Sequence, residues 1–454
     1  VREPFSASFS CERENAQSAC LPIRPMSLSF NAPVPRKQAE GIRLVSGAGS
    51  TKPQLEGDGN QADADSVVTQ ITFPGPFDEQ TRFTLELPRG FQDASGRTLR
   101  NADNFPLKVA TGARPPLAKF AAAPFGVVER LAEPGGVALM PVTVRNVEPA
   151  LAVQALTPGR VSDLNPKTDA EIIAWFRKVQ RYDNYTVDRA TAAKDLKSAL
   201  PAKLEKNDTR VQTRMVSLLA GQPGVKALDM PKATAGDPRP FEVVGIPLTP
   251  GFHVLEIASQ KLGGALLDER YGDSRTMYVR TSVLATNLGV HFKLGRDNAM
   301  AWVTTLDSGA VVPGAQVQVS DCRGELLASG TTDAQGVAAL KDLSPEPPRC
   351  NGEDDYQSAY FVSARAKDAK GVEDLAFAWS DWQRGIEPWR FNLPTSRDPL
   401  PDQRAHTIFD RTLVRAGETV SMKHLVRTET RNGVGVPDDL PKTLVVTHVG
   451  SGQQ

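Results

Sequence analysis

The sequence predicts a mainly β protein made of tandem Ig-like antiparallel β-sandwich domains, the second of which carries a helical insertion. Two observations predict this class. Apolar residues alternate with polar ones in many short segments, as in strands with one buried face. The 36 Gly and 35 Pro residues punctuate these segments as turns do. At roughly 150 residues per domain, the length of 454 residues indicates about three domains.

The first predicted domain spans residues 1–115 and is an Ig-like β-sandwich. Asp93–Gly96 is a predicted turn, because Asp can bond its own backbone and Gly accepts a positive φ. The two prolines after Arg114 cannot join a sheet interior, so they predict a linker. The alternating apolar sets are Met26, Leu28 and Phe30, then Phe83, Leu85 and Leu87, then Phe105, Leu107 and Val109.

The second predicted domain spans residues 116–282, a β domain with a helical insertion at about 166–222. Thr168 and Glu171 have the spacing of a capping box, which predicts that a helix begins at Thr168. Two apolar sets at helical spacing predict two helices in the insertion. They are Ile172, Trp175, Phe176 and Val179, and then Val211, Met215, Leu218 and Leu219.

The third predicted domain, 283–400, is again a β-sandwich. Turn residues at Asp307–Gly309 and Thr332–Gly336 flank residues 311–319, which predict a Pro-Gly turn followed by an alternating strand. Residues 401–454 begin a further domain, with strands expected at Thr407–Phe409, Thr419–Val426 and Thr443–Val449. These 54 or so residues are too few for a sandwich of roughly 100, so we expect an incomplete domain and a chain that is part of a longer protein.

The four cysteines fall into two local pairs, Cys11 with Cys20 and Cys322 with Cys350. Four cysteines allow three connectivities, and short loops cost the least entropy to close, which favours the two local disulfides. Disulfides in turn indicate an oxidising compartment. Free buried thiols are the alternative. Zinc is disfavoured, because neither pair has Cys-x-x-Cys spacing and no histidine cluster lies nearby.

Charge and motif content exclude several functions. Lys and Arg total 53, as do Asp and Glu, and no basic block stands out, so nucleic acid is not an expected partner. No apolar run is long enough to span a membrane. Phosphate-loop, zinc-protease and serine-hydrolase motifs are absent, so no catalytic, cofactor-binding or metal-binding residue is predicted. The acidic stretches at Asp58–Asp65 and Glu353–Asp355 are interpreted as solvated loops.

An aromatic and basic segment near the end of the third domain is a candidate interface. Trp382, Trp389 and Arg390 are residue types that often anchor interfaces. We expect them to pack between domains, with docking of a partner as the alternative.

One motif in residues 401–454 carries a resemblance to a known family. The run from Asp410 and Arg411 through Gly417 and Glu418 to Val420 resembles the strand–turn–strand hallmark of a macroglobulin domain in the alpha-2-macroglobulin family. The family usually has Tyr and Pro at the positions of Val414 and Ala416, so the turn lacks a preset φ. Residues 307–336 and the segment Trp382–Phe391 also look like bacterial members, and the resemblance covers about 283–430.

The resemblance implies macroglobulin-like sandwich domains and the scaffold of a periplasmic pan-protease inhibitor without enzyme activity. Such inhibitors enclose a protease after it cuts a bait segment, and some carry a Cys-x-Glu-Gln thioester. The thioester motif is not present at Cys322, since Arg323, Gly324 and Glu325 follow it. No bait segment is recognisable in this sequence either. The implied partners are proteases, the downstream domains of the same protein and a periplasmic peptidoglycan synthase. The parent would be periplasmic, with a lipoprotein anchor in the inner membrane as one arrangement.

A tandem Ig-like binding or adhesion protein of the cell envelope is the alternative. Stacked sandwiches and Thr-Asp-x-x-Gly turns fit that function equally well. Near-identical modules downstream would favour adhesion, and a large helical region would favour the protease trap.

Overall fold

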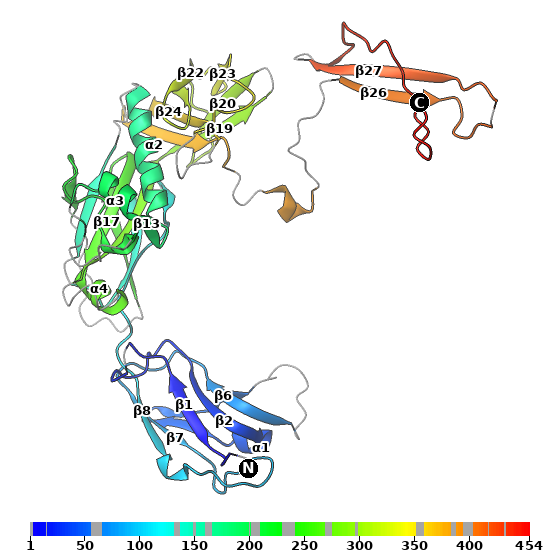
Figure 1. Ribbon diagram of the computed structural model, residues 1–454. Helices are drawn as coiled ribbons and strands as arrows, with labels where there is room; N and C mark the ends of the chain where they lie inside the picture. The colour runs from blue at the N-terminus through cyan, green and yellow to red at the C-terminus, as the bar shows by residue number, and fades with distance from the viewer. Residues whose placement is uncertain are drawn as a thin grey trace.

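The computed structural model shows successive β-sandwiches and few helices (Figure 1). This confirms the predicted mainly β class, with antiparallel pairing in most of the sheets. The structure describes residues 3–14, 16–55, 66–130, 137–148, 151–158, 166–198, 200, 209–228, 241–267, 275–295, 298–350, 358–382, 387–393, 403–415, 417–430 and 433–454.

The first sandwich consists of two four-stranded sheets, β1-β2-β6-β5 and β4-β3-β7-β8. The alternating residues predicted for β2 do point inward, since Met26 and Leu28 are fully buried. The Asp93 turn also forms, with Asp93 accepting the backbone N–H of Ser95 and Gly96 at φ +78°. The elements are β1 (Ala7–Cys11), β2 (Met26–Pro35), α1 (Arg36–Ala39), β3 (Arg43–Ser46), β4 (Gly49–Thr51), β5 (Gln54–Leu55), β6 (Val67–Phe73), β7 (Arg82–Glu86), η1 (Ala102–Asn104) and β8 (Leu107–Ala110).

The second sandwich pairs the sheet β10-β18-β17-β12-β15 with the sheet β16-β11-β9. One pairing departs from the antiparallel prediction, because β10 runs parallel to β18. The elements are β9 (Leu117–Phe120), β10 (Phe125–Glu129), β11 (Ala138–Arg145), β12 (Ala152–Leu156), β15 (Lys226–Leu228), β16 (Glu242–Leu248), β17 (Gly251–Ser259), α4 (Gln260–Leu266) and β18 (Met277–Thr286).

The insertion between β12 and β15 is only partly helical. Its first predicted helix exists, but the second does not: Val211 lies in a strand, Met215 in a 3-10 turn, and Leu218 and Leu219 in the turn that follows. The elements are α2 (Pro166–Arg181), β13 (Thr186–Asp188), α3 (Arg189–Asp195), β14 (Arg210–Gln212) and η2 (Thr213–Met215).

The third sandwich pairs the sheet β19-β20-β23 with the sheet β22-β21-β24-β25. The side chains between the two sheets are apolar, among them Val317, Val319, Val362 and Ala364. The elements are β19 (Leu288–Leu294), β20 (Ala299–Thr305), β21 (Gln316–Ser320), β22 (Leu326–Thr331), β23 (Val337–Leu340), β24 (Phe361–Lys367) and β25 (Glu373–Trp379).

The last part of the chain forms a small three-stranded sheet, β26-β27-β28, preceded by the 3-10 turn η4 (Pro388–Phe391). The strand expected at Thr443–Val449 is not formed, and its apolar side chains are exposed. Alternation alone does not make a strand, because a strand also needs a neighbouring strand to pair with. The strands are β26 (Gln403–Phe409), β27 (Met422–Thr430) and β28 (Gly433–Gly435).

Candidate functional site

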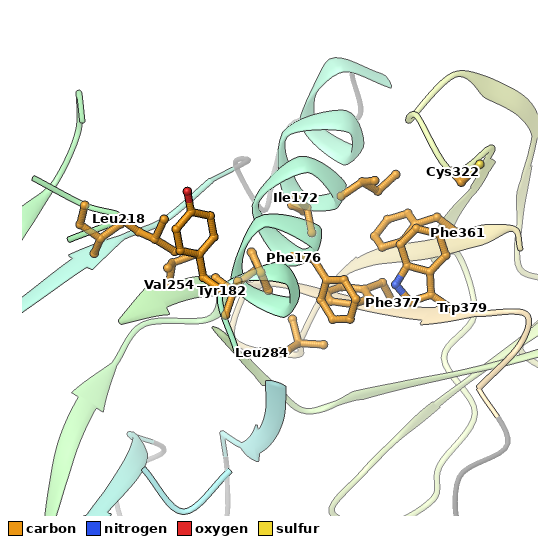
Figure 2. Close-up of a cluster of buried hydrophobic side chains, with 14 of the residues drawn as sticks. Ile172, Phe176, Tyr182, Leu218, Val254, Leu284, Cys322, Phe361, Phe377 and Trp379 are labelled. Atoms are coloured by element: carbon orange, nitrogen blue, oxygen red, sulfur yellow. The ribbon is translucent and has the colours of Figure 1, made fainter. Parts of the chain in front are cut away.

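Helix α2 lies against the outer face of the sheet β22-β21-β24-β25, where the second and third sandwiches meet (Figure 2). Of its predicted apolar face, Ile172, Phe176 and Val179 are buried and Trp175 is half-buried. The same core cluster includes Phe252 and Leu284 of the second sandwich. The helix therefore contacts both sandwiches.

Aromatic rings fill the centre of this junction. The Phe176 ring centroid lies 5.2 Å from that of Phe125, 6.2 Å from Phe377 and 6.0 Å from Trp379. Trp382 joins the cluster, with its centroid 5.3 Å from that of Phe125. Its ring is 39% exposed, so it closes the edge of the cluster.

The first turn of α2 carries a buried ion pair with the third sandwich. Arg365 on β24 donates to Asp169 over 2.6 Å, and the Ser363 hydroxyl donates to the other oxygen of Asp169, also over 2.6 Å. Both charged side chains are at most 4% exposed. The predicted capping box is wrong, because α2 begins at Pro166 and Thr168 is already inside it. Proline suits the first helical position, where its missing N–H has no intrahelical partner to lose.

A second charged contact also joins the two sandwiches. Arg130 follows β10 and contacts Asp368 over 2.7 Å and Asp374 over 3.5 Å. The hydrogen bond from Arg130 lowers the pKa of Asp368. Burial raises the pKa of Asp374, although its carboxylate accepts the backbone N–H of Asn287 over 2.8 Å. This carboxylate thus fixes the chain at the point where it enters the third sandwich.

A buried Arg–Glu pair explains why residues 211–219 are not helical. Arg280 on β18 pairs with Glu256 on β17 over 3.3 Å and donates to the carbonyls of Thr213 and Val216. Glu256 also accepts the N–H of Leu218 over 2.9 Å. These two side chains form hydrogen bonds with backbone groups that a helix would pair internally. The segment is therefore irregular, although its apolar residues have helical spacing.

Both cysteine pairs are bonded as local disulfides, Cys11 with Cys20 and Cys322 with Cys350. Cys322 and Cys350 belong to the core cluster under α2. The turn that begins at Asp321 also approaches α2 closely. A β-carbon placed on Gly324 would lie 2.4 Å from the Cα of Ala170, so only glycine fits there, and its φ of +87° suits glycine as well.

The motif Asp410, Arg411, Gly417 and Glu418 forms the connection between β26 and β27. Arg411 lies 3.7 Å from Glu418, and Glu418 accepts the N–H of Arg415 over 3.0 Å. Gly417 makes the turn at φ +87°. The residues are therefore placed as in a strand–turn–strand unit, and their family role stays a prediction.

The other predicted interface residues lie apart from the junction. Trp389 is 70% exposed in η4, with the guanidinium of Arg390 4.9 Å from its ring centroid and Glu387 bonded to Arg390. An interface role for Trp389 and Arg390 stays a prediction.

A cavity of about 620 Å³ opens beside α2 in the second sandwich, lined among others by Trp175, Glu171, Lys226 and His253. The His253 ring is engaged at both nitrogens, by Thr157 over 2.9 Å and the Thr249 carbonyl over 2.7 Å. Burial lowers the pKa of His253. This histidine serves the fold, since both ring nitrogens are committed.

No group of three or more His, Cys, Asp or Glu side chains that could hold a metal occurs among the described residues. The acidic stretches Asp58–Asp65 and Glu353–Asp355 lie outside those residues. No helix within the described ranges is long and apolar enough to cross a membrane.

Comparison with known proteins identifies the third sandwich. The described fold is a series of β-sandwiches, the second of which carries an insertion of helices and short strands. Residues 285–398 match the family model of the bacterial alpha-2-macroglobulin MG3 domain. By this match the third sandwich is similar to the MG3 domain of bacterial alpha-2-macroglobulins.

Solved structures give more distant similarities. Native alpha-2-macroglobulin from Escherichia coli, spanning domains MG0-NIE-MG1, is 14% identical with a TM-score of 0.37, over 82% of this chain and 96% of that one. Salmonella alpha-2-macroglobulin reacted with methylamine is 14% identical with a TM-score of 0.41, over 94% of this chain. The match spans only 21% of the Salmonella chain.

Proposed function

We propose that this chain is the N-terminal scaffold segment of a periplasmic pan-protease inhibitor that traps proteases after bait cleavage. The observation that carries the proposal is the match of residues 285–398 to the bacterial MG3 domain. Members of this family are protease inhibitors rather than enzymes. The bait and thioester regions would lie outside this chain.

The role of this segment in such an inhibitor would be mechanical. Both cysteine pairs are closed as disulfides, so neither supplies a thiol for a thioester. The contacts between α2 and both sandwiches favour a rigid structural role for this segment over a chemically reactive one. Its direct partners would then be the downstream domains of the same protein. The full-length protein would in addition enclose a protease.

The test uses the full-length parent protein and a broad-specificity protease. After incubation, residual cleavage is assayed on a large protein and on a small peptide. Enclosure predicts that the large substrate is spared while the peptide is still cut, because only the peptide can reach an enclosed active site. The 454-residue chain alone, at equal molarity, is the matched control and should protect neither substrate.

Unchanged cleavage of both substrates by the parent would refute the trap. The alternative, a tandem Ig-like binding or adhesion protein of the cell envelope, would then explain the stacked sandwiches.

The location and the envelope partner form a separate part of the proposal. We expect the parent in the periplasm, with a lipoprotein anchor and a peptidoglycan synthase as neighbour. Cell fractionation and crosslinking in intact cells would test both, and recovery of the parent in the cytoplasm would contradict them.

A further inference from the structure

The buried core under α2 is built by both sandwiches and the insertion together. It includes Ile172 and Phe176 of α2, Val254 of β17, and Phe361 and Phe377 of the third sandwich (Figure 2). These positions span more than 200 residues of sequence, and their side chains are at most 6% exposed. Separating the sandwiches would therefore bring large apolar and aromatic surfaces into water.

Charged groups cross the same boundary. Asp169 of α2 and Arg365 of β24 are both buried, so each needs the other as its partner while the two sandwiches stay packed. Arg130 reaches Asp368 and Asp374 from the opposite side of the boundary. The two contacts attach different parts of the second sandwich and its insertion to the third.

The close approach of Gly324 to Ala170 shows how tightly the surfaces fit. The backbones touch with no room for a β-carbon, which is typical of permanent packing rather than of a loosely docked surface. The turn is held by Asp321, which accepts the N–H groups of Arg323 and Glu325, each over 2.8 Å.

We infer that the second and third sandwiches, joined by α2, fold and unfold as one cooperative unit over residues 117–382. Helix α2 packs against both sandwiches and so fixes the angle between them. A change in that angle would require breaking the shared core. This inference concerns the mechanics of the chain and does not depend on protease trapping.

The experiment is hydrogen exchange of the full chain, resolved by segment with mass spectrometry across a denaturant series. One set of amides comes from β17 and β18, the other from β21 and β24. A cooperative unit predicts one shared unfolding midpoint for the two sets. Two separate midpoints in the wild-type chain would overturn the inference without any variant.

Glycine variants test whether a local change is transmitted. Gly314, in the third sandwich, has φ +76° and free space around it, so Gly314→Ala adds only backbone strain. It should speed exchange of both amide sets by the same factor, about 5- to 30-fold. Gly324→Ala adds the clash with Ala170 and should speed both sets further.

Gly96→Ala in the first sandwich is the matched control, since Gly96 has φ +78° and equally free space. It should speed exchange in the first sandwich and leave both amide sets unchanged. An effect of Gly314→Ala confined to β21 and β24 would show two independent units and refute the inference. Should Gly324→Ala fail to fold, the wild-type midpoints and Gly314→Ala still decide.

Discussion

The first sandwich and the α2 junction bury their apolar residues in different ways. The core of the first sandwich takes its buried residues only from positions 5 to 109. The core under α2 takes its residues from positions 172 to 379 and joins two sandwiches. The first sandwich thus has a core of its own, whereas the second and third sandwiches share one.

The polar contacts repeat this contrast. Next to the first sandwich, the Asn146 side chain donates to the Arg114 carbonyl over 2.7 Å at an exposed site. At the α2 junction, Asp169 and Arg365 pair with both side chains at most 4% exposed. Water can replace an exposed hydrogen bond, whereas a buried charge left without its partner has no such replacement, so the two connections should respond differently to mutation.

Loss of the buried ion pair should have the largest effect. Asp169→Ala leaves Arg365 charged and buried without its partner, so we expect the second and third sandwiches to lose about 3–5 kcal/mol of unfolding free energy. Denaturant unfolding followed by tryptophan fluorescence would measure the loss, because Trp379 lies in the affected core.

Glu12→Ala in the first sandwich is the control for this substitution. Glu12 and Arg24 lie 2.9 Å apart, but both side chains are more than half exposed. We expect a change of about 0–1 kcal/mol. Equal effects of the two substitutions would mean that the junction is no more tightly built than the surface of the first sandwich.

The two disulfides give the next comparison. Cys322–Cys350 closes a loop with a sequence separation of 28, and Cys11–Cys20 one of 9. Loop-closure entropy alone gives about 3.6 kcal/mol for the first bond and about 2.7 kcal/mol for the second. Thermal unfolding of the double Cys→Ala variants should show that loss of Cys322–Cys350 destabilises α2 as well, whereas loss of Cys11–Cys20 affects the first sandwich. A Cys322–Cys350 effect confined to the third sandwich would contradict the shared core.

The two tryptophans of the candidate interface should differ in a similar way. Trp382→Ala removes ring contacts with Phe125, Phe176 and Phe377, so we expect a loss of about 1–2 kcal/mol. Trp389 is mostly exposed, so Trp389→Ala should change stability by less than about 0.5 kcal/mol. A large loss for Trp389→Ala would place it in a contact between domains.

Sequence patterns predicted the sandwiches and α2 because those features depend on local periodicity. Ile172, Phe176 and Val179 do line one buried face. The predicted helix around Met215 failed because Arg280 and Glu256, far along the sequence, bind its backbone groups. Local spacing cannot reveal such tertiary competition.

The junction itself could not be predicted from the sequence. Asp169 and Arg365 are 196 residues apart, and nothing in either local pattern marks the other as its partner. An acidic residue is favoured in the first turn of any helix, so the presence of Asp169 there does not reveal its pairing with Arg365. Gly324 stands in a turn where glycine is expected, so its contact with Ala170 left no separate signal.

The last predicted effect is a small pH dependence that arises from a histidine of the second sandwich. Burial holds the pKa of His253 below its ordinary value of 6.5, so the folded state favours the neutral ring. The unfolded chain then binds more protons as the pH falls, and stability decreases with acidification. From pH 7 to pH 6 the unfolding free energy falls by up to about 0.7 kcal/mol.

His253→Gln should reduce this dependence of the unfolding free energy on pH in denaturant unfolding of the second and third sandwiches. His406→Gln, on the exposed β26, controls for the loss of one histidine. If the two cores were separate, only the second sandwich would follow the titration of His253. The same pH dependence of unfolding in the third sandwich would show that the shared core transmits the titration of His253. If His253→Gln kept the wild-type pH dependence, that dependence would come from other residues.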